Sequence, residues 1–572
     1  MRQGLYLVAV RRFGDLTPGP WLRQEPPPLR ERRGGTALSP AKGRGVRSAA
    51  GVRARPRTTR QRTLPARSAP LDGAPPTWYT DSLMDETPEQ SRGPSLAEAA
   101  SLRSTRDLTT GSIPRHLLAF SLPMLAGTAL QAAYSFVNAL WVGNKLGKDA
   151  MAAITVSFPV LFVLLAIAGG LTMGANVLVA QHFGAKDHEG VRRVVRNSNA
   201  LVLMVGLVFV IAGHNAAERI LVLMNTPPEV LGLATGYLRI FLWSMPSMFA
   251  VFLIASQLRG TGDAKTPLYF QIVGVTVTAI LDPILMFGWF GAPALGLNGT
   301  AVAAVITQAG ATVALAWYVV ARRHIIAPDI RNMRPDRETT ALILKIGVPS
   351  MLQQALASLG IAFMTGIVNR FGADAAAAFG AAGRIDQLAF MPAMTIGAAV
   401  STLSGQNIGA RHFHRVREIF RWALFMGCGI TLLATVTALI APEHAIRLFV
   451  KDANVIAIGA GYLRIMGPGY ILFAVMFVGN GIANGAGHTF ISTLTTLVGL
   501  WFVRVPLAQY LTTVTGRVDG VWWAMLAGFV AGVAISVGYY YSGLWRKPIG
   551  RRDTMPVPAQ LAAEVACEVG AE

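Results

Sequence analysis

The chain has 572 residues, of which 52% are hydrophobic and only 14% are charged, and its formal net charge is +21. This composition is typical of a polytopic membrane protein and excludes an ordinary soluble enzyme of two or three domains. With only two cysteines, Cys428 and Cys567, the chain has neither a disulfide framework nor a cysteine metal cluster.

Residues 1–112 form a basic extension rich in Arg, Pro, Gly and Ser. Residues 1–70 alone hold 16 of the 51 Lys and Arg residues but only 3 of the 30 Asp and Glu residues. Few apolar residues recur at a helical or strand period, so disorder is predicted. Prolines argue against a targeting helix, and without interleaved aromatic residues we expect no nucleic-acid partner. Binding of anionic lipid stays open, but a mis-assigned start, with Met84 as the alternative, is the interpretation we favour.

From residue 117 onward the chain is a series of twelve long apolar segments. A stretch of about 20 apolar residues crosses a bilayer, and a helix satisfies its own backbone polar groups there. The predicted fold class is therefore an all-α polytopic membrane protein with twelve transmembrane helices. The expected helices span residues 117–142, 150–182, 194–214, 234–259, 266–289, 298–322, 341–369, 375–404, 418–440, 458–484, 490–514 and 519–545.

The apolar segment at residues 266–289 contains one acidic residue, Asp282, and Pro283 follows it directly. A carboxylate in the middle of a membrane costs about 2.5–3.5 kcal/mol on insertion scales, and such residues usually have a function. Proline has no N–H, so the carbonyl of Ala279 loses its helical partner. The pattern indicates a candidate ion site. The alternative is that Asp282 caps a broken helix or bonds a neighbouring helix for structure.

Lys and Arg are unevenly divided between alternate loops. The loops near Lys186, Arg259, Arg322 and Arg411, together with the flank from Arg546, carry most of them. Cytoplasmic loops collect Lys and Arg. We therefore expect a multi-pass protein of the cell (inner) membrane with both termini in the cytoplasm.

The two halves of the apolar region resemble each other. Residues 236–240 recur identically as residues 461–465, an offset of 225, and the same offset pairs Gln181 with Gln406. These two glutamines lie beside turns and are expected to bond backbone groups. Each half has six segments, so the repeat is parallel, with a pseudo-twofold axis along the membrane normal. The predicted domains are an N-terminal lobe (113–322), a cytoplasmic linker (323–340), a C-terminal lobe (341–546) and a disordered tail (547–572).

Three polar residues in the apolar segments of the C-terminal half are candidates for a polar contact: Asp386, Asn480 and Asn484. Asp386 lies two residues after Arg384, on a different face of its helix. It is a candidate contact for an ion or substrate, or a partner for another helix. Asn480 and Asn484 share one helix face, where they line a cavity or bond one helix to another.

Six short motifs carry a resemblance to a known family: residues 120–123, 136–143, 180–185, 258–267, 280–283 and 404–410. Their order and spacing are similar to those of the multidrug and toxic compound extrusion (MATE) family across residues 113–546. The resemblance implies two six-helix lobes in a V shape. It also implies export of small organic cations or drugs, driven by inward H⁺ or Na⁺, with no cofactor beyond the transported ion.

The resemblance also suggests where the ion binds. Relatives often have one Asp near the end of the first helix and another in the fifth helix. Asp282 matches the second of these, but Asn138 stands at the first. An amide binds a cation or a carboxylate but cannot release a proton, so Asp282 is expected to carry the coupling with Asn138 as a neutral ligand. Many relatives also have a Glu in the seventh helix, whereas residues 352–357 contain no acid.

Other functions stay open. A lipid or polysaccharide-intermediate flippase of the same superfamily would need a strongly cationic cavity, and few Arg residues fall inside the predicted bundle. A membrane-embedded enzyme needs a nucleophile with a base, or clustered His and carboxylates, and no His-x-x-Glu-His, Gly-x-Ser-x-Gly or Walker motif occurs. A channel fits the repeat less well. We therefore expect a monomeric, non-enzymatic, cation-coupled antiporter that works by alternating access.

Overall fold

The computed structural model describes residues 106–327 and 336–549, which are helical throughout these ranges apart from short turns. The predictions made for most of the basic extension, including Met84, lie outside the described residues. The same is true of the centre of the linker and of the tail from residue 550.

The N-terminal half of the chain contains six membrane-crossing units. One of them is a pair of helices bent by 47° at a break between Leu242 and Met245. The helices are α2 (Ile113–Trp141), α3 (Lys148–Gly184), α4 (His188–Leu223), the bent pair α5 (Pro228–Leu242) and α6 (Met245–Gly260), α7 (Lys265–Phe287) and α8 (Leu297–Ala321).

Six further units form the C-terminal half. Within the described residues, 11 helices are long and apolar enough to cross a membrane, or 12 when the bent pair counts as one span. The prediction of twelve transmembrane helices is therefore confirmed. The helices are α9 (Arg337–Asn369), α10 (Ala373–Gly409), α11 (Phe413–Ile440), the short α12 (Pro442–Arg447), α13 (Ala453–Gly485), the span α14 (Thr489–Thr496), η6 (Leu497–Arg504) and α15 (Val505–Thr515), and α16 (Asp519–Tyr541).

Local sequence signals set many helix boundaries. Asp187 precedes α4 and accepts a hydrogen bond from the Gly190 N–H at 2.8 Å. Asp336 and Asp452 cap α9 and α13 in the same way. Each carboxylate satisfies an N–H group that has no partner inside its own helix.

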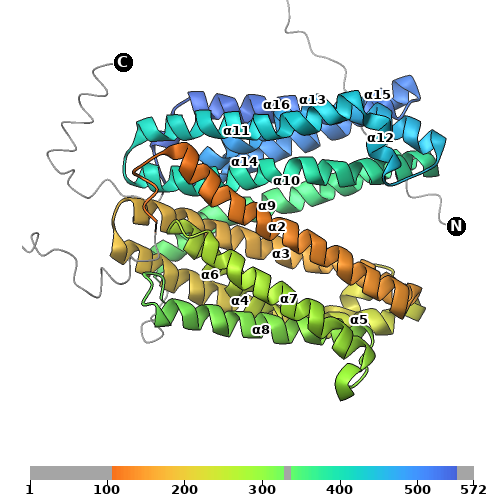
Figure 1. Ribbon diagram of the computed structural model, residues 1–572, viewed down its shortest axis with the longest axis horizontal. Coiled ribbons are helices and arrows are strands. Elements are labelled where there is room, and N and C mark those ends of the chain that lie inside the picture. The colour runs from red at the N-terminus through yellow and green to blue at the C-terminus, as the bar shows by residue number, and fades with distance from the viewer. Residues whose placement is uncertain (1–105, 328–335, 550–572) are drawn as a thin grey trace, which may run out of the picture. The chain divides into compact units, whose positions relative to one another are not determined.

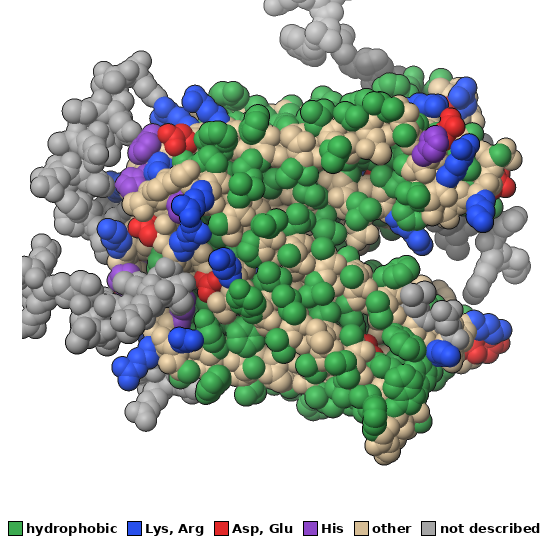
Figure 2. Space-filling view, in the orientation of Figure 1, with side chains coloured by type: hydrophobic (Ala, Val, Ile, Leu, Met, Phe, Trp, Pro, Cys, Tyr) green, Lys and Arg blue, Asp and Glu red, His purple; other side chains and the backbone are tan. Residues whose placement is uncertain are grey.

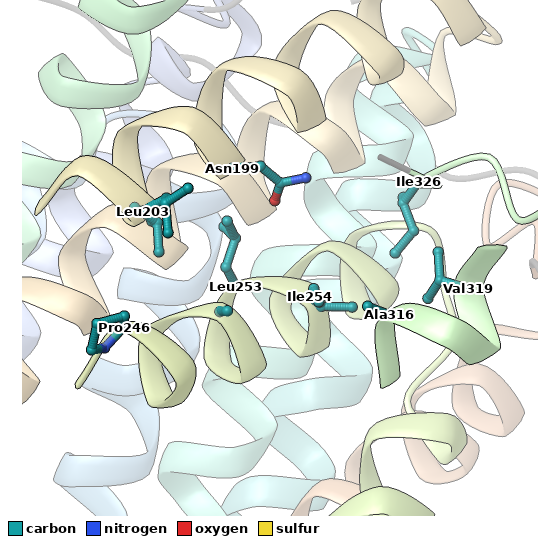
Figure 3. A pocket seen from close by; sticks show the side chains of 10 residues that line it. Asn199, Leu203, Pro246, Leu253, Ile254, Ala316, Val319 and Ile326 are labelled. Atoms are coloured by element: carbon teal, nitrogen blue, oxygen red, sulfur yellow. The ribbon is translucent and has the colours of Figure 1, made fainter. Parts of the chain in front are cut away.

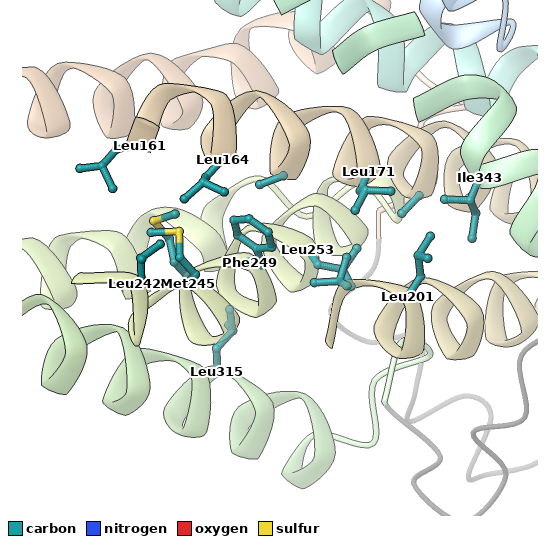
Figure 4. Close-up of a cluster of buried hydrophobic side chains, with 14 of the residues drawn as sticks. Leu161, Leu164, Leu171, Leu201, Leu242, Met245, Phe249, Leu253, Leu315 and Ile343 are labelled. Carbon is teal, nitrogen blue, oxygen red and sulfur yellow. The ribbon is translucent and has the colours of Figure 1, made fainter. Parts of the chain in front are cut away.

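The two halves form two bundles that pack along one seam (Figure 1). At the seam α3 packs against α9 and α10, and α2 packs against α10. Figure 4 shows the apolar core of the N-terminal bundle, where Leu164, Phe249 and Leu315 come from α3, α6 and α8. Ile343 of α9 reaches the same core, so the packing continues across the seam.

Figure 2 shows hydrophobic side chains along the length of both bundles, with Lys, Arg, Asp, Glu and His gathered at the two ends. This distribution is the one that a multi-pass membrane protein needs. The bundles meet at one end, here called the closed end, where α3 and α10 finish at Gly184 and Gly409. At the other end, called the open end and marked by α5 and α12 in Figure 1, Figure 2 shows a hollow between the bundles.

The sequence repeat is also a structural repeat. Arg239 of α5 forms an ion pair with Glu218 of α4 at 3.3 Å. At an offset of 225 residues, Arg464 of α13 forms the same pair with Glu443 of α12, also at 3.3 Å. All four side chains are well exposed, so each pair contributes at most about 1 kcal/mol. Their value here is that they mark equivalent positions in the two bundles.

The expectation of disorder through residue 112 is wrong for its last residues. Arg106–Gly111, here called the strap, crosses the closed end of the seam. The Leu108 side chain is buried, and it packs in an apolar cluster with Leu117 and Phe120. Its backbone N–H and C=O bond to Gln406 and Asn407 of α10. The strap has no periodic apolar pattern, but the buried Leu108 side chain and its paired backbone groups attach it to the bundle.

Candidate functional site

Asp282 lies inside the N-terminal bundle, between α7 and α2. Its side chain is only 2% exposed. One carboxylate oxygen, Oδ2, accepts two hydrogen bonds from α2, one from the Tyr134 hydroxyl at 2.8 Å and one from the Asn138 Nδ2 at 2.9 Å. The structure therefore brings together Asp282 and Asn138, the two residues that the family resemblance paired.

The spacing of the two donors explains why both reach the same oxygen. Tyr134 and Asn138 are four residues apart on α2, so they lie on one face of that helix. Asp282 is five residues from the end of α7, which continues through Pro283 to Phe287 and ends at Gly288 in the left-handed conformation. Because α2 and α7 both finish near this level, the site lies in the half of the bundle nearer to the open end.

Aromatic rings lie about one helical turn beyond the acid, toward the open end. Trp141 at the end of α2 packs on Phe287 and Trp289, with ring centroids 6.0 and 6.3 Å apart. These rings form an aromatic cluster at the ends of the two helices that carry the site.

The second carboxylate oxygen of Asp282 differs from the first, because no described residue donates a hydrogen bond to it. Oδ1 is buried and has no hydrogen-bond partner among the described residues. A buried carboxylate oxygen without a donor is costly unless it takes up a proton or a cation. The carboxylate, the Tyr134 hydroxyl and the Asn138 amide each offer an oxygen atom as a ligand, and oxygen ligands suit a hard cation. The residues present are therefore compatible with either a transported H⁺ or a Na⁺.

A second buried acid, Asp386, lies in the C-terminal bundle on α10. It is 7% exposed, whereas Arg384 is exposed, as their spacing on different faces predicts. The Tyr462 hydroxyl donates to its Oδ2, and the Tyr470 hydroxyl donates to its Oδ1 at 2.8 Å. Both tyrosines lie on α13, so Asp386 binds its helix to a neighbour and both of its oxygens have donors.

Arg504 adds a positive charge beside Asp386. It ends the π-helical stretch η6, and its guanidinium lies 4.6 Å from the centre of the Phe529 ring. It is close enough to Asp386 for an electrostatic interaction. Asp386 therefore has hydrogen bonds to both oxygens and a positive charge in its surroundings, in contrast to Asp282.

The other two polar residues singled out in the C-terminal half do not join Asp386. Asn480 and Asn484 lie 10 and 14 residues beyond Tyr470 on α13, about 15–21 Å along the helix axis. The Asn484 Oδ1 accepts a hydrogen bond from Ser492 of α14 at 2.8 Å, so it bonds one helix to another. The Asn480 Oδ1 is buried and has no partner in the part of the chain that the structure describes.

Sequence reasoning missed the tyrosines and the arginine that surround the two acids. Tyr462 belongs to the repeated pentapeptide, and its equivalent in the first half, Tyr237, is close enough to Asp282 to interact with it electrostatically. A repeated tyrosine in each half was a signal that could have been used. Arg504 is the only charged residue of its apolar segment and could have been noticed in the same way as Asp282.

An apolar pocket lies elsewhere in the N-terminal bundle, between α4, α6 and α8. Figure 3 shows Leu203, Leu253 and Val319 around it, with Asn199 as its polar residue. Neither Asp282 nor its donors line this pocket, so it is separate from the candidate ion site.

Two repeated bundles of six membrane spans, hollowed between them at one end, form an architecture that is typical of helical membrane transporters. The MatE family model matches this chain twice, at residues 123–284 and 349–510. The chain belongs to this family, the multidrug and toxic compound extrusion (MATE) efflux transporters.

The similarity between this chain and known relatives covers almost the whole length of each relative. The probable multidrug resistance protein YoeA of Bacillus subtilis (strain 168) is 31% identical over 447 residues, 77% of this chain and 96% of that protein. The probable multidrug resistance protein NorM of Thermotoga maritima is 26% identical, over 76% of this chain and 94% of that protein. A crystal structure of MATE in complex with MaD3S is 24% identical, covers 77% of this chain and 98% of its own, and has a TM-score of 0.71.

Proposed function

We propose that this protein exports small organic cations and drug-like molecules, and that each export step is coupled to inward movement of H⁺ or Na⁺ at Asp282. The observation that carries this proposal is the buried carboxylate with one oxygen held by two donors and the other oxygen unpaired. Such a group changes its interactions with α2 when it takes up or loses a cation. The relatives YoeA and NorM, both named as probable multidrug resistance proteins, support the substrate class.

The orientation of the protein is part of the proposal. The closed end carries most of the Lys and Arg, including those at Arg193, Arg322, Arg415 and Arg546. By the positive-inside rule this end faces the cytoplasm. The open end then faces outward, both termini are cytoplasmic, and the membrane is the cell membrane. In that orientation Asp282 lies nearer to the outer side, from which the driving ion comes.

Coupling requires that the bound ion change the contact between α2 and α7. With Asp282 charged, the Tyr134 and Asn138 donors both bond to a carboxylate, and such bonds are about twice as strong as neutral ones. A cation on the unpaired Oδ1 competes with these donors for the charge and weakens the attachment of α2. The movement of one charge across the membrane supplies about 2.3 kcal/mol per 100 mV, comparable to the cost of the buried acid.

Transport in inverted membrane vesicles tests the proposal. A fluorescent organic cation such as ethidium is followed while a pH gradient and a Na⁺ gradient are imposed separately. We expect uptake into the inverted vesicles with one of these gradients and its collapse when that gradient is dissipated. Uptake that needs neither gradient would contradict the coupled mechanism, and uptake driven by ATP alone would exclude it.

A further inference from the structure

The closed end of the seam is held by two glutamines at equivalent positions of the repeat. Gln181 of α3 donates from its Nε2 to the carbonyl oxygen of Gly485 at 2.8 Å. Gln406 of α10 donates from its Nε2 to the carbonyl oxygen of Gly260, also at 2.8 Å. Both side chains are buried. Each bond joins one bundle to the other, and the two bonds are related by the offset of 225.

The two acceptors are the last residues of their helices. Gly260 ends α6 and Gly485 ends α13, and the final carbonyl groups of a helix have no partner within it. A glutamine of each bundle therefore satisfies the last carbonyl group of a helix in the other bundle. When the bundles part at this end, water replaces both glutamines as the partner, so the contacts are separable without leaving a buried polar group unpaired.

Glycines let the helices approach closely enough for these bonds. Gly184, the last residue of α3, packs on the backbone of Gln406, and Gly409, the last residue of α10, packs on the backbone of Gln181. A Cβ atom at Gly409 would lie 2.8 Å from the carbonyl carbon of Gln181. Only a residue without a side chain fits at either position. The close backbone packing therefore follows the same repeat as the two hydrogen bonds.

The strap makes the two glutamines unequal. The Oε1 of Gln406 accepts the Leu108 N–H at 3.1 Å, so both ends of that amide are bonded. The Oε1 of Gln181 is buried and has no partner among residues 106–327 and 336–549. The strap also bonds to the other bundle, where the Arg106 N–H donates to the Thr261 carbonyl at 3.2 Å. It therefore crosses the seam beside Gln406 only.

We propose that Gln181 and Gln406 are paired latches that hold the closed end shut, and that the strap fastens the Gln406 latch alone. The inference rests on the alternating-access function proposed above, because the closed end must open once in each transport cycle. The latches are positioning residues: they set the balance between the two states of the seam and do not touch the substrate. The Gln406 latch with its strap is the stronger one, since opening the seam there breaks the bond to Gly260 and also one of the strap's bonds, at Leu108 or at Arg106.

Spin-label distances measure this balance directly. In a protein in which Cys428 and Cys567 are replaced by serine, one label pair is placed at the closed end, at Glu189 of α4 and Glu418 of α11, which are both exposed. A second pair is placed at the open end, at the exposed and repeat-equivalent Asp149 and Asp374. Measurements are made in lipid nanodiscs without substrate or an ion gradient, so they do not depend on whether transport occurs.

The variants are Q406L and Q181L, with Q509L as the control at an exposed glutamine near the open end of α15. With one hydrogen bond contributing about 0.5–1.5 kcal/mol, we expect the ratio of long to short closed-end distances to rise about tenfold in Q406L and about threefold in Q181L. The open-end pair should shift reciprocally toward shorter distances, which a local loss of structure would not produce. The milder Gln406→Asn and Gln181→Asn, which shorten the reach of the amide, serve if a leucine variant fails to fold.

The substitution L108D tests the strap, because a charge at this buried position expels the segment and leaves Gln406 with one bond. In that background the effects of Q406L and Q181L should become equal. Closed-end distances that stay unchanged in both glutamine variants would overturn the latches. Equal effects in the native background, or unequal effects that persist in L108D, would overturn the role of the strap.

Discussion

Replacing Asp282 with Asn removes the charge of the candidate ion site with the least change in shape. The amide oxygen can still accept from the Tyr134 hydroxyl and from Asn138, at positions that the carboxylate Oδ2 holds at 2.8 and 2.9 Å. Hydrogen bonds to a charged group contribute about 1.5–3 kcal/mol and neutral ones about 0.5–1.5 kcal/mol. The contact between α2 and α7 weakens but persists, so the variant should fold and reach the membrane.

The expected loss of transport is large. One coupled charge supplies about 2.3 kcal/mol per 100 mV, which corresponds to about a fiftyfold concentration ratio of the exported molecule. Without a titratable or charged group at the site, this contribution disappears and accumulation should fall to the level of vesicles without the protein. Facilitated movement down the substrate's own gradient should remain, since no residue of the seam is changed.

The assay is ethidium uptake into inverted vesicles at 100 mV, with protein amounts matched by immunoblot. Asp374→Asn, the same substitution at an exposed helix start, is the matched control and should transport normally. The reasoning would be refuted by an Asp282→Asn protein that still accumulates dye tenfold or more against its gradient. In that case Asp386 would be the next acid to test.

Three further predictions concern other described residues. Asn138→Ala removes one of the two bonds to Asp282, so it should lower the initial rate of coupled uptake about fivefold without abolishing it. Tyr462→Phe removes a donor from buried Asp386 and should lower the free energy of unfolding by about 1–3 kcal/mol, measured by titration with SDS, with Tyr510→Phe at an exposed position as the control. Burial lowers the pKa of His324 to about 4. Its neutral form therefore stabilises the protein above pH 6.5, and this contribution, on the order of 3 kcal/mol, is lost as the pH falls toward 4. The melting temperature of His324→Gln should depend less on pH across that window than that of the native protein, and an unchanged dependence would contradict the assignment.

The helices could be predicted from sequence because the bilayer imposes a minimum length of apolar chain on each span. Their ends at the seam could not. The helix expected at residues 375–404 is α10, which extends to Gly409, and the extra turn contains Gln406 and Asn407. These residues resemble loop residues in sequence, yet they are buried. Their burial depends on distant parts of the chain, and no local pattern reports a contact such as the one between Gln406 and Gly260, which are 146 positions apart.

At the candidate site, the local sequence identified the acid but not all of the residues that pack around it. Asp282 could be identified because a single acid in an apolar segment is costly. Its pairing with Asn138 came from the family resemblance and not from the physics of either helix. The Tyr134 donor was not identified, because a tyrosine in an apolar helix is ordinary, and only the packing of α7 against α2 brings its hydroxyl to the carboxylate.

The repeat is kept at the closed end, whereas neither buried acid has an acidic equivalent in the other half, and this contrast bears on how the protein works. The offset of 225 relates the latching glutamines and the glycines beneath them, but it places Leu507 at the position of Asp282 and Leu161 at the position of Asp386. Bundles that rotate about a pseudo-twofold axis make and break equivalent contacts on both sides of the seam, as the two glutamines do. Ion coupling needs no such match: one carboxylate with an unpaired oxygen is sufficient, and a second in the other bundle would compete for the same ion. The fully bonded Asp386 beside Arg504 is therefore what a bundle that moves without carrying the coupling ion would contain.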